Sequence, residues 1–245
     1  MFLHSFLALK EYEGSYWHGI DGLHNCTDHI EVDQNKMAET HAANCIIDLA
    51  KQHKGEICLV AIGPLTNLAL AIRLCPDLPS LLKEVVILGG NYTGLGNITA
   101  TAEFNFAIDP IAAHVVLKEY TCPMFVVPWE TVTQWSFSGN FLEEYCHKNN
   151  DKSRLFKEVI LRHLSKHDSQ SVHSADCLAM CVALNRENMI VEQMEVHATV
   201  EPFGEHTHGM MIVDRRKQTE NAPNITLITK VNTKCLVDML MHSVS

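Results

Sequence analysis

The chain has 245 residues, of which 47% are hydrophobic, and 19 Lys and Arg against 29 Asp and Glu give a formal net charge of -10. This length suffices for one large domain with a substantial core, and the negative charge disfavours nucleic acid, because a polyanion is repelled. No apolar run approaches the roughly 20 residues of a membrane span, and the start, MFLHSFLALKEYE, lacks the features of a signal peptide, so we expect a cytoplasmic protein.

The first half of the chain alternates between predicted helices and predicted strands. Helical patterns cover residues 38–55, 63–74 and 109–120, and continuous apolar strands cover residues 56–63, 83–90 and 122–130. Strands without polar alternation, separated by helices, are typical of parallel strands that are covered on both faces. The sequence therefore predicts an α/β fold with an open, mostly parallel, Rossmann-like sheet in a single domain over residues 1–245.

The last third of the chain departs from this alternation. A long helical stretch begins near Phe156 and leads to a helix over 174–184; three strands follow, over 194–203, 208–216 and 224–231, and a helix over 233–242 closes the chain. Two of the strands could form a hairpin.

One stretch in the first half, TAEFNFAIDPIAA (101–113), places Glu103 and Asn105 two residues apart in an otherwise apolar run. If the segment is extended, both side chains point to the same face and could bind the hydroxyls of a ligand. The alternative is a polar bend before a helix, with Asp109 as the N-cap and Pro110 in the first turn.

Ligands of open α/β sheets bind beyond the carboxyl ends of the strands. Three sequence features fall there: the turn at residues 62–64, the loop from 89 to 105, and the turn at 128–131. Asp176 lies in the first turn of a predicted helix, where a carboxylate can simply interact with the helix dipole.

Histidine and cysteine give weaker signals. His163 and His167 have the spacing of two metal ligands on one helix face, but no nearby carboxylate completes a zinc set. The nine cysteines are scattered without a C-x-x-C pair, which is typical of small core residues rather than of a disulfide framework.

Taken together, five blocks in one order resemble the inosine-uridine nucleoside hydrolases, which cut the N-glycosidic bond of ribonucleosides with a bound calcium. The blocks are WHGIDGL (17–23), AIGPLTNLALAI (61–72), ILGGNYTGLGNITATAEFNFAIDPIAA (87–113), SADCLAM (174–180) and GMMIVD (209–214). The third block is long and highly specific. The resemblance implies a ribonucleoside substrate and a homo-oligomer.

The resemblance also assigns roles to residues. It implies that Asn97, Glu103 and Asn105 bind the ribose hydroxyls, a role that suits one carboxylate and two amides. It further implies that the backbone carbonyl of Ile62 and the carboxylate of Asp176 bind calcium, which prefers oxygen ligands.

The chain also departs from the family pattern. Family members open with an aspartate-rich strand and turn, D-x-D-x-G-x-D-D, that supplies most calcium ligands and the base that activates water, and these 245 residues contain no such motif. The sequence therefore assigns no catalytic base, and calcium binding is expected to be weak or absent. Many members carry a histidine where this chain has Ala175, and His173 is the nearest substitute.

Three hypotheses follow from these departures. The first is a nucleoside hydrolase represented by an N-terminally truncated chain that lacks the family's first strand. The second is an inactive protein that retains a ribose or nucleoside pocket, and the third is a partner in an oligomer. The chain as given is expected to show no appreciable hydrolysis, because the general base and most of the metal charge would be missing together.

Overall fold

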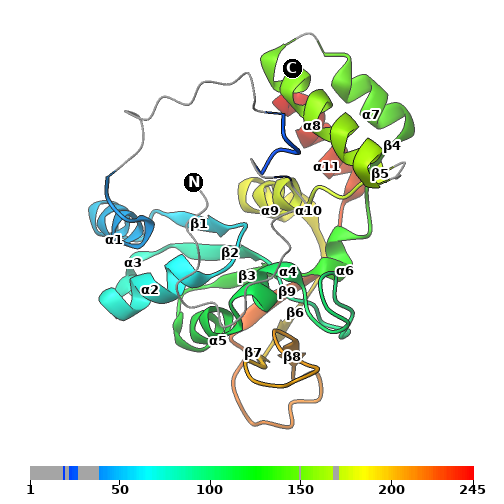
Figure 1. The fold of residues 1–245 in the computed structure, drawn as a ribbon. Helices are drawn as coiled ribbons and strands as arrows, with labels where there is room; N and C mark the ends of the chain where they lie inside the picture. Colours follow the sequence, from blue (N-terminus) through cyan, green and yellow to red (C-terminus); the bar gives the residue numbers. More distant parts are fainter. Residues whose placement is uncertain (1–18, 20–21, 27–38, 149, 168–170) are drawn as a thin grey trace.

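The computed structural model describes residues 19, 22–26, 39–148, 150–167 and 171–245. Its centre is a five-stranded sheet in the order β1-β2-β3-β9-β6 (Figure 1). The strands are β1 (Cys58–Ala61), β2 (Glu84–Leu88), β3 (Met124–Val127), β9 (Ile225–Val231) and β6 (Ile190–Val196). β1, β2, β3 and β9 run parallel, and β6 pairs antiparallel with β9.

Helices cover both faces of the sheet, and alternate residues of β2 pack on opposite faces. Val85 and Ile87 join one hydrophobic core, whereas Val86 and Leu88 join the other, as expected for a strand with a two-residue period. All five residues of β2 are buried, which explains why its sequence is continuously apolar.

The first core lies under the helices that connect the parallel strands: α1 (Ala42–Gln52), α2 (Thr66–Leu74), α3 (Leu78–Leu81) and α5 (Pro110–Glu119). The second core lies under α6 (Trp129–Val132), α7 (Gly139–Cys146), α8 (Asp151–His167), α9 (Ala175–Leu184), α10 (Arg186–Met189) and α11 (Thr233–Ser243). Two small antiparallel sheets complete the described structure: β4 (Phe137–Ser138) with β5 (Ser171–Val172), and β7 (Ala198–Val200) with β8 (Met211–Val213).

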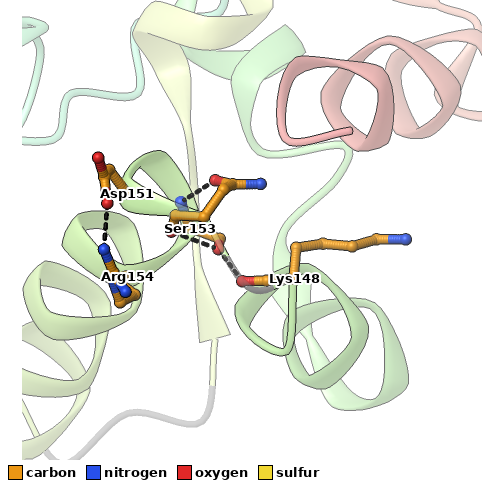
Figure 2. A network of polar contacts seen from close by, with 5 residues as sticks. Lys148, Asp151, Ser153 and Arg154 are labelled. Atoms are coloured by element: carbon orange, nitrogen blue, oxygen red, sulfur yellow. Dashed lines mark hydrogen bonds and ion pairs between the residues drawn. The ribbon is translucent and has the colours of Figure 1, made fainter.

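A polar network fixes the start of α8 (Figure 2). The Ser153 amide donates to Asn150 Oδ1 at 3.0 Å, and the Ser153 hydroxyl donates to the carbonyl of Lys148. Arg154 pairs with Asp151 one turn along the helix. Because Asn150 also donates to the Val244 carbonyl at 2.6 Å, the network ties the beginning of α8 to the end of α11.

The predicted α/β fold with a mostly parallel sheet is confirmed. Asp109 is the N-cap of α5 and accepts from the Ala112 amide at 3.0 Å, with Pro110 in the first turn, so this half of the polar-bend alternative is also confirmed. The segment 103–105 is not extended throughout: Glu103 is extended, but Asn105 lies inside α4 (Phe104–Ile108).

Other predicted boundaries shift. α8 begins at Asp151 rather than near Phe156, because Asn150 caps it. The predicted strand over 194–203 is two strands, since β6 ends at Val196 and β7 begins at Ala198; β7 and β8 form the suspected antiparallel pair. Most of the first resemblance block, 17–23, lies outside the described residues. Within the described part of the chain, no helix has the length and apolar character needed to cross a membrane.

Candidate functional site at the carboxyl edge of the sheet

The parallel strands bring several chain turns to one edge of the sheet. β1 ends just before Ile62, β2 just before Gly89, and β3 just before Pro128. Because these strands are parallel, their carboxyl ends meet at the same edge. α9, whose first turn carries Asp176, packs against β1 and β2, so Asp176 belongs to the same region.

At this edge, Asn97 and Glu103 together hold the first turn of α4. The Phe104 amide donates to Asn97 Oδ1 at 2.8 Å. The Asn105 amide donates to Glu103 Oε1 at 2.8 Å, and the Phe106 amide donates to Glu103 Oε2 at 3.2 Å. These amides begin a helix and have no partner within it, so the two side chains satisfy them as caps.

Glu103 also anchors the turn that follows β2. The Gly90 amide donates to Glu103 Oε2 at 2.9 Å. Gly90 has φ +70°, and a Cβ at this position would lie 2.9 Å from Sδ of Met211 and from the Phe106 ring. Glycine is therefore favoured both by the backbone conformation and by the close packing of Met211 and Phe106.

Glu103 is buried, with 5% of the residue exposed. Burial raises its pKa to about 7, while the amides of Asn105, Gly90 and Phe106 oppose the shift and the charge of Asp176 adds to it. The contribution of Asp176 means that the two carboxylates lie within electrostatic range of each other. A carboxyl that titrates near neutral pH beside a strand end is typical of a functional site.

Asn105 is buried beside Glu103. Its Nδ2 donates to the Leu88 carbonyl at 3.1 Å, at the end of β2. In the described part of the chain, no hydrogen bond reaches the Asn105 amide oxygen. The structure thus brings Asn97, Glu103 and Asn105 together at the start of α4, in agreement with their predicted proximity.

Asp176 and Ile62 are the two predicted calcium ligands. The Asp176 side chain is exposed, yet the loss of water on the side facing the protein raises the pKa of its carboxyl. Calcium takes six to eight oxygens. Among the residues that the structure describes, no group of three or more His, Cys, Asp or Glu side chains could hold a metal ion. These residues alone do not fit a calcium site.

His173 lies at the same edge but is already engaged. Its Nδ1 is 2.9 Å from the carbonyl of Trp135, so this nitrogen donates, and its ring packs edge-on against Trp129 at 6.0 Å between centroids. The donor role of Nδ1 leaves Nε2 as the basic nitrogen of a neutral ring.

The sequence reasoning missed Glu130. Its Oε1 accepts from the Tyr92 amide at 2.8 Å and from the amide and hydroxyl of Thr93, both at 2.6 Å. Glu130 therefore joins the turn after β3 to the loop after β2. Its other oxygen, Oε2, is buried and has no hydrogen-bond partner in the described structure. The available signal was an acidic residue directly after an apolar strand end.

His24 and Asn25, which follow the first resemblance block, have φ angles of 56° and 60°. This left-handed conformation favours glycine, and asparagine and histidine tolerate it better than most other residues. His24 Nε2 lies 3.2 Å from His163 Nδ1, so this segment packs against α8.

Comparison with known proteins supports the resemblance. The family model "Inosine-uridine preferring nucleoside hydrolase" matches residues 6–238. The chain is 33% identical over 215 residues to the inosine-uridine preferring nucleoside hydrolase of Crithidia fasciculata, covering 86% of this chain and 67% of that protein. It is 34% identical over 209 residues to the enzyme of the same name from Leishmania major, covering 82% of this chain and 64% of that protein.

The fold is also similar to solved structures. An inosine-guanosine nucleoside hydrolase superposes with a TM-score of 0.84 at 28% identity, over 93% of this chain and 74% of that one. A plant nucleoside hydrolase gives the same TM-score of 0.84 at 24% identity, over 96% of this chain and 76% of that one. The chain spans about two thirds of the length of the sequence relatives it matches.

Proposed function

The chain belongs to the inosine-uridine preferring nucleoside hydrolase family, and we propose that it acts in the hydrolysis of the N-glycosidic bond of ribonucleosides to ribose and free base. One observation carries the proposal: Asn97, Glu103 and Asn105 meet at the start of α4, beside the carboxyl end of β2. The family reaction needs a group that recognises ribose, and this cluster supplies the polar atoms for it.

Each member of the cluster keeps capacity for a ligand. Glu103 accepts three backbone donors, whereas two carboxylate oxygens offer about four acceptor positions. Asn105 retains its amide oxygen, and exposed Asn97 retains its amide nitrogen. Two acceptors and one donor match a vicinal diol, in which each hydroxyl both donates and accepts. Since the backbone holds these groups in place, they are preorganised for the sugar.

Calcium is the cofactor expected from the family, and we propose Asp176 and the Ile62 carbonyl as two of its oxygen ligands. When bound, such an ion lowers the pKa of a coordinated water and fixes sugar hydroxyls. The described residues supply only part of a coordination shell, so we assign no reaction step to the ion. Calorimetric titration with calcium tests the ligand role in a protein completed with the family's aspartate-rich segment: there Asp176→Asn should weaken binding, and unchanged affinity would mean that Asp176 only interacts with the helix dipole.

The reaction is tested by incubating the protein with inosine, uridine and a chromogenic riboside, with and without calcium, while ribose and free base are measured. We expect the 245-residue polypeptide to bind ribosides and to release ribose slowly at most, because no described residue is in place as the base that activates water. If neither inosine nor uridine bound saturably, the proposal would be contradicted. Binding without any release would favour the alternative of an inactive ribose-binding protein.

The family resemblance also leads us to propose a homo-oligomer. Light scattering on the purified protein tests this: a mass equal to that of one 27.5 kDa chain over a range of concentrations would contradict it.

A further inference from the structure

Asn97 lies on a loop whose two arms are joined by a side chain. The loop runs from Asn91 to Thr101, between the turn after β2 and the helix cap Glu103. Asn91 Nδ2 donates to the Thr101 carbonyl at 2.7 Å, a bond between residues ten positions apart. This bond closes the loop that carries one of the three proposed ribose-binding side chains.

Asn91 is part of the protein interior. Its exposed fraction is 0%, and its Oδ1 accepts from the Met211 amide at 3.4 Å. The Thr101 carbonyl can only accept and the Met211 amide can only donate, so each end of the Asn91 side chain has one defined role. An aspartate of the same shape would keep the acceptor and lose the donor, and the buried Thr101 carbonyl would lose its partner.

The arm that begins with Asn91 is fixed by two other elements. Glu130, in α6, accepts from the amides of Tyr92 and Thr93 at 2.8 and 2.6 Å. Arg215, in the loop after β8, donates to the Tyr92 carbonyl. These bonds hold the first arm against the body of the protein, so the Asn91 side chain can fix the second arm in turn.

The second arm holds the backbone of Asn97. The Asn97 amide donates to the carbonyl of Ala102 at 3.2 Å, and Ala102 directly follows Thr101. A Cβ at Gly96 would clash with the backbone of Ala102, so glycine permits this close approach. A displacement of Thr101 would therefore also displace Asn97.

We propose that Asn91 is a positioning residue for ribose recognition: it fixes Thr101, and through this segment it holds Asn97 where the Asn97 side chain meets a sugar hydroxyl. The inference rests on the proposed function, because it takes Asn97 as a ribose ligand. Asn91 is buried and uses both polar atoms of its side chain within the protein, so it acts through Asn97 rather than on the sugar. A binding group that is already ordered does not lose conformational freedom when the ligand binds, which increases affinity.

The first test needs no ligand and compares amide hydrogen exchange, followed by NMR, in the wild type and in Asn91→Asp. Exchange should increase about three- to tenfold at the Asn97 amide and at the Phe104 amide, which donates to Asn97 Oδ1. This factor corresponds to the loss of one hydrogen bond. Unchanged exchange at both amides in the folded variant would overturn the proposal.

Two further variants control for the added charge. Asn188→Asp places the same charge at an exposed asparagine of α10 and should leave the exchange of Asn97 and Phe104 unchanged. Asn91→Ala removes the donor without adding a charge and should increase exchange at the same two amides as Asn91→Asp does. If neither Asn91 variant folds, titration of the wild type with inosine decides: the side-chain amide of Asn91 should shift with the same Kd as the backbone amide of Asn97, and a shift at Asn97 alone would overturn the proposal.

The second test measures inosine affinity by calorimetry in a double-mutant cycle. Asn91→Ala should weaken binding about fivefold or more in the wild-type background and less than about twofold in the Asn97→Ala background, because Asn91 acts through Asn97. A residue that only stabilises the fold would leave the affinity of the folded protein unchanged, and an independent ligand would give equal factors in both backgrounds. Either result would overturn the proposal. If the wild type did not bind inosine, the proposed function itself would be contradicted, whereas the exchange measurement tests the link between Asn91 and Asn97 separately.

Discussion

Glu103 and Asp214 perform the same local task in two different environments. Each carboxylate accepts three hydrogen bonds, Glu103 from backbone amides at the carboxyl edge and Asp214 from the donors of Gln218 and Thr219 in the loop after β8. Their pKa values move in opposite directions: burial raises that of Glu103 to about 7, whereas the hydrogen bonds from Thr219 and Gln218 lower that of Asp214 to about 2.

The contrast shows that exposure to solvent, rather than the number of hydrogen bonds, decides the sign of the shift. Desolvation disfavours the charged carboxylate at Glu103 more than three donors can compensate. At Asp214 water keeps its contact with the charge, so the donors dominate. The same capping geometry therefore produces a carboxyl that titrates near neutrality in the candidate site and a permanently charged anchor in the loop.

The largest expected effect is the loss of the Glu103 side chain. Glu103→Ala should lower the free energy of unfolding by about 2–4 kcal/mol, because several amide donors would lose their partner in a buried region. Chemical denaturation measures the change, and Glu56→Ala, which removes an exposed carboxylate, is the matched control. If both variants were equally stable, the amides at this edge would not depend on Glu103.

The second effect concerns pH. Because the folded-state pKa of Glu103 is raised from 4.5 to about 7, the folded protein holds this proton more tightly, and its contribution to stability decreases as the pH rises from about 4.5 to about 7. Denaturation curves measured across this range for wild type and Glu103→Gln isolate the contribution. A difference between the two proteins that does not vary with pH would contradict the raised pKa.

A smaller effect is expected at Asn97, which caps one amide of α4 from an exposed position. Asn97→Ala should lower the free energy of unfolding by about 0.5–1 kcal/mol, in the lower range for the loss of a helix cap. Thermal unfolding followed by circular dichroism measures it. If Asn97→Ala lowered the free energy of unfolding as much as Glu103→Ala does, solvent exposure would not explain the difference in stability that we expect between the two caps.

The smallest effect is expected at Asp214. Asp214→Asn should leave the midpoint of thermal unfolding close to that of wild type, because the loop is exposed, but it should increase hydrogen exchange at the amides of Gln218 and Thr219. Unchanged exchange at these two amides would mean that Asp214 does not anchor the loop. The pH dependence of Asp214 is opposite to that of Glu103. The ionised Asp214 carboxylate stabilises the folded state above about pH 4, and this stabilisation is lost as the pH falls through about 2.

The sequence was sufficient to predict the elements that depend on local pattern. β1, β2 and β3 are continuous apolar segments between helices, and Asp109 followed by Pro110 marks the start of α5. The proximity of Glu103 and Asn105 was also predicted, although for an extended segment rather than for a helix cap. At this position the Glu103 carboxylate accepts hydrogen bonds from the amides of Asn105 and Phe106, so a helix begins where the spacing indicated an extended segment.

The remaining features depend on contacts between distant segments. Glu130 accepts hydrogen bonds from Tyr92 and Thr93, which lie 38 and 37 residues earlier in the chain. The Thr199 hydroxyl forms a hydrogen bond with His114, 85 residues away. No local periodicity encodes such contacts.

The central claim is that the carboxyl edge recognises ribose, and the most direct measurement compares the binding of inosine with that of 2'-deoxyinosine by calorimetry. Inosine should bind at least about tenfold more tightly, because the deoxy compound leaves buried polar groups without a partner. Asn105→Ala should remove most of this preference, while Asn188→Ala, a change at an exposed asparagine of α10, should retain it. Equal affinities for the two nucleosides in the wild-type protein would contradict the claim.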